Sequence, residues 1–128
     1  MATVTLAEYE KAIGTLSEAL LLFDNSAEGS VERRAFRDTC IQRFEFCVEL
    51  AWKVAKKTMG TNSSAPKTVV REMAQDNLIE DPAVWLSFVD ARNKSSHTYD
   101  DDIAQEVFAV VRKFPEEGIA LLKALEVK

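Results

Sequence analysis

Residues 31–59 decide the fold, and they read VERRAFRDTCIQRFEFCVELAWKVAKKTM. Apolar residues recur in this stretch every three or four positions, which is the spacing of one face of an α-helix. Gly60 follows directly and suits the left-handed conformation that often ends a helix. The stretch therefore predicts one helix, roughly 44 Å long at 1.5 Å per residue. Its predicted buried stripe comprises Phe36, Cys40, Ile41, Phe44, Cys47, Val48, Ala51, Val54 and Ala55.

The segment before this helix predicts a second helix over about residues 6–24. Thr5 and Glu8 form a Thr-x-x-Glu capping box, and Val4 can pack against Tyr9 across the first turn. Spacings of three and four again define one apolar face. This face comprises Leu6, Tyr9, Ile13, Leu16, Leu20 and Phe23.

Shorter helices are predicted after Gly60. Ser64 and Pro66 can start one of them, and the pair Asp81-Pro82 is a favoured start for another. The weak helix formers of residues 94–96 then interrupt the pattern. A last apolar stripe runs from Ile103 to Leu125, and Pro115 within it should kink the helix.

Length and composition place these helices in one domain. The chain has 128 residues, of which 47% are hydrophobic and 29% are charged, as in globular proteins that bury a core. Strand-like alternation of useful length is absent from the sequence. We predict a single domain over residues 1–128, an all-α, antiparallel, up-and-down four-helix bundle with one or two short extra helices.

Charge and cysteine content limit the classes of function that the sequence allows. A net charge of −5 argues against a general nucleic-acid coat protein but allows a small basic cleft. Cys40 and Cys47 are separated by about 10 Å along one helix, too far for a disulfide, so we expect core residues in a reducing compartment. With one histidine and no paired thiols the sequence has no zinc-ligand spacing, and we expect neither metal nor cofactor.

The start of the chain, Met1–Thr5, lacks a basic region followed by an apolar run. No apolar run approaches the length that spans a bilayer. We therefore expect a cytoplasmic protein that does not bind a membrane.

The residues that carry chemistry gather in residues 92–99, RNKSSHTY. His97 is the only histidine, and imidazole transfers protons near neutral pH. Arg92 offers a planar cation suited to phosphate. The two side chains would point about 140° apart on a continuous helix, so they converge only if the helix breaks at residues 94–96. His97 would then lie near the positive N-terminal end of the last helix, a place that suits an anion.

The arrangement Arg-x4-His-x-Tyr formed by Arg92, His97 and Tyr99 resembles the signature of the HEPN domains, which are small helical bundles. Residues 41–53 resemble the second-helix signature of the HEPN subfamily called nucleotidyltransferase substrate-binding proteins. Residues 85–99 are similar to the same subfamily, so the resemblance covers nearly the whole chain in order and length.

The resemblance implies a function and partners. HEPN bundles of this kind pair as homodimers that bring two Arg-His motifs to a shared cleft, and active members are metal-independent ribonucleases that act as toxins. A minimal nucleotidyltransferase serves as the antitoxin, and in some systems it adds adenylate to the motif tyrosine. Carried over, Arg92 and His97 are the catalytic pair, Asn93 orients the phosphate and Tyr99 is the candidate modified residue.

Chemistry also favours a dimeric site. Cleavage of RNA through its 2′-hydroxyl benefits from one base and one acid, and a chain with one histidine supplies both only if a second chain contributes its own. Water is the alternative for either role. Arg92 would stabilise the charge that develops on the transferring phosphate.

Three other groups have two interpretations each. Glu49 either belongs to a solvated stripe with Lys53 or lies at the cleft and orients Arg92 or His97. The cluster of Arg33, Arg34 and Arg37 is a solvated face or a contact for RNA or the antitoxin. The two tryptophans are core or dimer-interface residues; they are Trp52 and Trp85.

The leading hypothesis is therefore an RNA endonuclease toxin that is neutralised by a nucleotidyltransferase. The alternative is a non-catalytic subunit that binds the substrate or nucleotide of a two-component nucleotidyltransferase. The intact Arg92/His97 pair favours the first, because a pure binding subunit has no obvious need of it. A third possibility is a plain structural bundle, against which the polar break at residues 94–96 argues.

Overall fold

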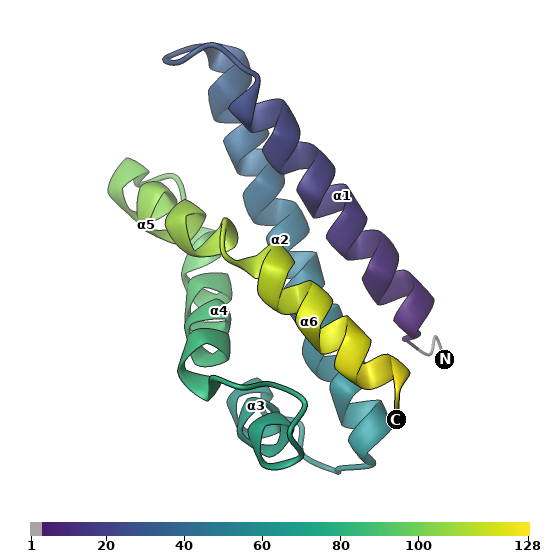
Figure 1. Ribbon diagram of the computed structural model, residues 1–128. Coiled ribbons are helices and arrows are strands. Elements are labelled where there is room, and N and C mark those ends of the chain that lie inside the picture. Colours follow the sequence, from purple (N-terminus) through teal and green to yellow (C-terminus); the bar gives the residue numbers. More distant parts are fainter. Residues whose placement is uncertain (1–3) are drawn as a thin grey trace.

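The computed structural model describes residues 4–128 as an all-helical bundle (Figure 1). No strand occurs within that range, so the predicted all-α class is confirmed. Residues 1–3, on which part of the signal-sequence prediction rests, lie outside the described residues. None of the helices formed by residues 4–128 has the length and apolar content to cross a membrane.

The helices are α1 (Leu6–Asp24), α2 (Val31–Met59), α3 (Pro66–Gln75), α4 (Pro82–Lys94), α5 (Asp101–Val111) and α6 (Phe114–Glu126), with a 3₁₀ turn, η1 (Ser95–His97), between α4 and α5.

Helices α1 and α2 form a long antiparallel hairpin along which α6 packs (Figure 1). The predicted start of α1 is confirmed, because Thr5 Oγ1 accepts a hydrogen bond from the Glu8 backbone N–H at 3.1 Å. The predicted end of α2 is confirmed by Gly60, whose φ of 71° is left-handed. Both ends are thus set by local sequence, and the apolar faces between them form the core.

An aromatic cluster joins α2, α4 and α6 at the centre of the bundle. The ring of Phe44 meets those of Phe88 and Phe114 edge-on, at centroid distances of 6.1 and 5.8 Å. The indole of Trp85 adds edge-on contacts to two of these rings, at 5.1 Å from Phe88 and 5.6 Å from Phe114. Edge-to-face pairs in this range contribute about 0.5–1.5 kcal/mol beyond area burial. The cluster therefore fixes α4 and α6 against α2, and Trp85 is a core residue.

The C-terminal stripe forms two helices, so the prediction of one kinked helix is wrong in detail. Helix α5 ends at Val111, and α6 begins at Phe114 with Pro115 in its first turn. Proline lacks an N–H and its ring would collide with the carbonyl of the residue four positions earlier, which is Val111. A continuous helix would place the Pro115 ring against that carbonyl. The helix therefore ends at Val111, and α5 turns towards α4.

Helix α3 also starts differently from the prediction. Its N-cap is Ala65, which makes no side-chain cap, and not Ser64. Pro66 occupies the first turn as expected, where its missing N–H costs nothing. The inward face of α3 is confirmed as Val69, Val70 and Met73.

Both cysteines are free thiols in the core, as the spacing predicted. Burial raises the pKa of Cys40 to about 11 and that of Cys47 to about 12. The thiolate is the nucleophilic form of cysteine, so both side chains serve packing and neither is a candidate nucleophile.

Gly118 gives a test of this packing. A Cβ built there would lie 2.6 Å from Phe114 Cε1, and the Phe114 ring is held in the aromatic cluster. Overpacking costs about 1–3 kcal/mol, more than the roughly 0.5–1 kcal/mol that alanine gains over glycine in a helix. We predict that Gly118→Ala lowers the free energy of unfolding by about 1–2 kcal/mol in urea denaturation.

Gly14→Ala is the matched control, because a Cβ there meets nothing within 4 Å. It should stabilise the protein by about 0.5–1 kcal/mol. Equal effects of the two substitutions would contradict the described packing around the Phe114 ring.

Candidate active site

The helix break predicted between Arg92 and His97 is present. Helix α4 ends at Lys94, and the chain tightens into the 3₁₀ turn η1. Ser95 is buried and its Oγ donates to the Arg92 carbonyl oxygen at 2.6 Å, which satisfies a group that the ending helix would leave free. The turn packs against α2, α4 and α5 and thereby fixes the direction of the chain that carries His97.

Arg92 is held by a carboxylate from α2. Its Nε donates to Glu49 Oε1 at 3.0 Å, and Lys53 Nζ lies 3.5 Å from Glu49 Oε2. The side chains of Arg92 and Glu49 are 38% and 31% exposed. The hydrogen bonds of residues 4–128 engage only Nε of this guanidinium. Its two terminal nitrogens, the fork that grips phosphate, therefore remain for a ligand.

The histidine and the tyrosine of the motif lie together at the surface. His97 is exposed, its ring centroid is 6.0 Å from that of Tyr99, and Tyr99 is 87% exposed. Asn93 is exposed as well. The structure thus pairs Arg92 with Glu49 and His97 with Tyr99, without a hydrogen bond between the two pairs in the described chain.

Helix α5 begins just after His97, as the sequence predicted. Asp100 caps it, because its Oδ1 accepts from the backbone N–H groups of Asp102 and Ile103 at 3.0 and 3.3 Å. The anion-binding capacity expected beside His97 is therefore taken up by the helix's own cap. The Arg92 side chain remains the cationic group for an anion at this end of α4.

Phe46 is a surface residue beside this site that the sequence reasoning missed. It lies three residues before Glu49 on α2, hence on the same side of the helix, and is 61% exposed. An apolar residue among the polar positions of a long helix is the signal that could have found it. Trp52, three residues beyond Glu49, is half-buried.

Known proteins resemble this chain in sequence and in fold. Residues 4–127 match the family described as nucleotidyltransferase substrate binding protein like. A probable ribonuclease HepT of Haemophilus influenzae is 34% identical over 93 residues, which span 66% of this chain and 64% of that protein. The match therefore covers slightly less than two thirds of that relative's length.

Two solved structures share the fold. HI0074 of Haemophilus influenzae, reported as the fold of a substrate binding domain of a nucleotidyltransferase, superposes with a TM-score of 0.82 at 28% identity, over 95% of this chain and 99% of that one. A protein of Thermus thermophilus superposes with a TM-score of 0.77 at 30% identity, over 91% and 98% of the two chains.

Fold and sequence together define a HEPN-like helical bundle. The chain belongs to the nucleotidyltransferase substrate-binding protein-like family. The resemblance drawn from residues 41–53 and 85–99 is thereby confirmed.

The Glu49–Arg92 pair should position the guanidinium more than it stabilises the fold. Partly exposed pairs are worth about 0.2–1 kcal/mol in double-mutant cycles. We predict a coupling free energy in that range for Glu49→Gln and Arg92→Gln, measured by urea unfolding. The exposed Lys67–Asp90 pair, 2.6 Å apart, is the control and should give a similar value. A coupling above about 2 kcal/mol would instead make Glu49–Arg92 a structural element of the bundle.

Proposed function

We propose that the protein is a metal-independent RNA endonuclease of a toxin-antitoxin pair, with Arg92 and His97 as its catalytic residues. The observation that carries the proposal is the Arg92 guanidinium, fixed through Nε by Glu49 with its terminal nitrogens left for a phosphate. The 3₁₀ turn η1, which follows α4 in the chain, carries the exposed imidazole of His97. The similarity to a probable ribonuclease supports the same conclusion.

The residues can carry out cleavage through the 2′-hydroxyl when a separate acid protonates the leaving group. His97 accepts the 2′-hydroxyl proton, the 2′-oxygen attacks phosphorus, and the bond from phosphorus to the 5′-oxygen breaks. The products are a 2′,3′-cyclic phosphate and a 5′-hydroxyl, whose proton comes from an acid. Arg92 stabilises the charge on the phosphate oxygens during the attack, and Asn93 helps to orient the phosphate.

A homodimer would supply the missing acid, since each chain has one histidine. Exposed aromatic rings next to the site, those of Phe46 and Tyr99, support a protein surface there, because aromatic residues are enriched at interfaces. His97 of the second chain, or water, would protonate the leaving oxygen.

The proposed partner is a minimal nucleotidyltransferase acting as antitoxin. Its support is the family description and HI0074, which was reported as a substrate binding domain of a nucleotidyltransferase. Tyr99 is the proposed acceptor of adenylate, since its side chain is 87% exposed and lies 6.0 Å from the His97 ring. An adenylate there would place a bulky anion at the site and repel the RNA backbone.

The second candidate function is a non-catalytic subunit that binds a substrate or nucleotide for the nucleotidyltransferase. The description of HI0074 favours it. In that case Arg92 would hold the phosphate of the bound molecule, and His97 would transfer no proton.

Cleavage assays separate the two functions. We predict that the purified chain cuts RNA in the presence of EDTA. His97→Ala should lower the rate about 100- to 10,000-fold through loss of proton transfer, and Arg92→Ala about 100- to 1,000-fold through loss of electrostatic stabilisation. Arg71→Ala, an exposed arginine on α3, is the control and should leave the rate unchanged.

Cleavage that persists at the same rate in His97→Ala would contradict the assigned role of the histidine. Absence of cleavage, together with tight binding of a nucleotide that Arg92→Ala abolishes, would establish the binding subunit instead.

The proposed dimer has its own test. We predict that the chain sediments as a dimer at micromolar concentration and that Phe46→Asp weakens association at least about tenfold, because a charge would be buried at the interface. Leu21→Asp on α1, where Leu21 is 62% exposed, is the matched control and should leave the dimer intact. A monomeric wild-type chain would exclude the shared site.

A further inference from the structure

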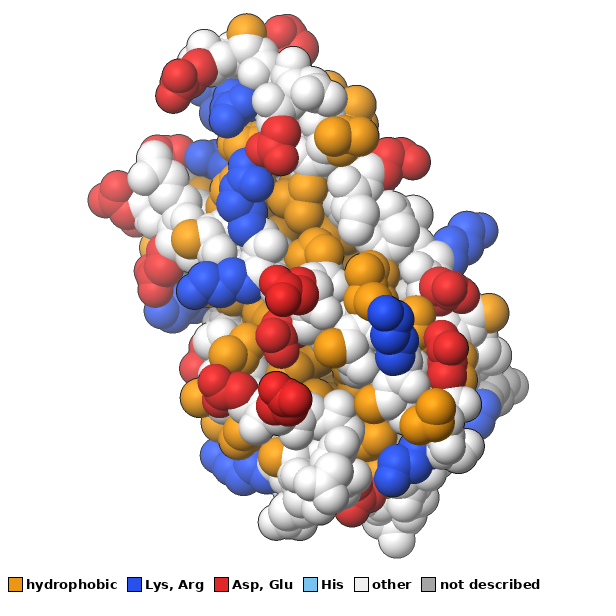
Figure 2. Space-filling view, in the orientation of Figure 1, with side chains coloured by type: hydrophobic (Ala, Val, Ile, Leu, Met, Phe, Trp, Pro, Cys, Tyr) orange, Lys and Arg blue, Asp and Glu red, His pale blue; other side chains and the backbone are white. Residues whose placement is uncertain are grey.

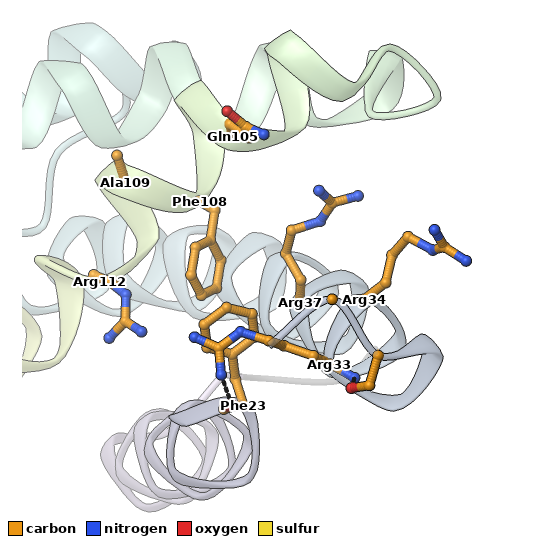
Figure 3. Close-up of a pocket in the computed structure, with 10 residues that line it drawn as sticks. Phe23, Arg33, Arg34, Arg37, Gln105, Phe108, Ala109 and Arg112 are labelled. Carbon is orange, nitrogen blue, oxygen red and sulfur yellow. Dashed lines mark hydrogen bonds between the residues drawn. The ribbon is translucent and has the colours of Figure 1, made fainter. Parts of the chain in front are cut away.

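Four arginines line a pocket at the end of the α1–α2 hairpin, where α5 crosses the first turns of α2 (Figure 3). The pocket has a volume of about 500 Å³, within the range of small-molecule sites. Neither Arg92 nor His97 belongs to it. Besides Arg33, Arg34, Arg37 and Arg112, its walls include Phe23, Phe108 and Ala109.

Arg33 and an aromatic ring form the bottom of the pocket. Its Nη1 donates to the carbonyl oxygens of Phe23 and Ser26, both at 2.9 Å. Its guanidinium carbon lies 4.0 Å from the centroid of the Phe23 ring, which tilts against the ring of Phe108 at 4.5 Å. The bottom of the pocket is therefore planar and preorganised, since the Arg33 guanidinium is fixed by two carbonyl groups and one ring.

Arg37 and Arg112 are also fixed. Arg37 Nη1 lies 2.9 Å from Asp101 Oδ1, and its Nε lies 3.5 Å from Asp38 Oδ1 without a hydrogen bond in the described chain. Arg112 pairs with Asp24 and places its guanidinium carbon 5.1 Å from the Phe108 ring centroid. The prediction of a solvated face for the arginine cluster is thus wrong for Arg33 and Arg37, which are built into the structure.

The pocket has positive charge to spare. The ion pairs of residues 4–128 engage Arg37 and Arg112 but not Arg33 or Arg34, and no acidic residue lines the pocket. Arg34 is exposed. Basic side chains gather between the hairpin end and α5 on the face in Figure 2. Four of the seven arginines of the chain line this one pocket, although the net charge of the chain is −5.

We propose that this arginine pocket binds a nucleoside phosphate, with the phosphate held by Arg34 and the nucleobase stacked near Arg33 and Phe108. Arginine matches phosphate with paired donors and stacks on flat rings, which lysine does not. The apolar wall made by Phe108 and Ala109 suits a base. A free mononucleotide and one unit of an RNA strand share this chemistry.

If the ligand is one unit of an RNA strand, the pocket would assist the proposed RNA cleavage. This part of the proposal rests on the proposed function. Arg37 contacts Asp101, which follows His97 by four residues, so the Cα atoms of His97 and Asp101 lie within about 14 Å by chain reach. A strand cut at His97 could therefore also contact the arginine pocket. The pocket would then add affinity without taking part in the chemistry.

Binding is measured by fluorescence anisotropy and calorimetry in the full-length His97→Ala chain, which keeps the test independent of cleavage. The probes are AMP, inorganic phosphate and a short single-stranded oligoribonucleotide. We expect AMP or the oligoribonucleotide to bind more tightly than phosphate. Arg34→Glu should weaken that binding by about tenfold or more, whereas Arg71→Glu, with the same charge change on α3, should not.

Ala109→Glu is a second variant that keeps all four arginines and adds a carboxylate to an exposed helix position of the wall. It should also weaken binding about tenfold, and Ala109→Gln, of the same size without the charge, should weaken it less. Binding of AMP identifies the mononucleotide, and binding of the oligoribonucleotide alone identifies the strand. Loss of AMP binding in Arg92→Ala but not in Arg34→Glu would place the nucleotide at the candidate active site instead of this pocket.

Three results would overturn the proposal. If inorganic phosphate bound as tightly as AMP and the oligoribonucleotide, the nucleobase would contribute nothing to binding. Affinities that do not respond to Arg34→Glu and Ala109→Glu would place binding elsewhere. Absence of nucleotide binding, as expected if the pocket docks an acidic segment of a protein partner, would exclude a nucleoside phosphate.

Discussion

Edge-to-face packing of four aromatic rings is the interaction on which the rest of the structure depends. The rings belong to Phe44, Trp85, Phe88 and Phe114. They come from α2, α4 and α6 and meet where these helices cross, so they set the position of α4 against α2. Arg92 lies one turn beyond Phe88, and Glu49 lies five residues beyond Phe44 on α2. The contact between Glu49 and Arg92 is therefore a consequence of core packing. Because the core fixes the geometry, a weak surface ion pair is enough to orient the guanidinium.

The functional groups lie where this packing ends. Ser95 is the last buried residue of the motif segment, and the side chains of His97 and Tyr99 project from the turn into solvent. An exposed imidazole beside exposed aromatic rings would be an incomplete site in one chain, so we propose that a second chain completes it. The arginine pocket differs, because carbonyl groups, carboxylates and rings of one chain hold three of its four cations.

Local signals in the sequence were sufficient for most of the fold. Caps and apolar spacing depend on residues within one or two helical turns, so the bounds of α1 and α2 followed from them. Pro115 showed that a helix is disturbed, but whether it kinks or ends depends on the surrounding packing. The partner of Arg92 is 43 residues away, and spacing alone left Glu49 with two interpretations. The arginine cluster also kept two interpretations, because its partners come from the hairpin turn and from α5, which only the tertiary fold brings to α2.

We propose that Arg92 and His97 form one phosphate-binding site for RNA. Because the chain has one histidine, the imidazole signals in a proton NMR spectrum belong to His97 without further assignment. The most direct measurement adds an oligoribonucleotide with a single 2′-deoxy substitution at the cut site, which binds but lacks the attacking hydroxyl. We predict that the His97 signals shift on addition to the wild-type chain and that Arg92→Ala largely removes the shift. Signals that stay unchanged in the wild-type chain at saturating oligonucleotide would contradict it.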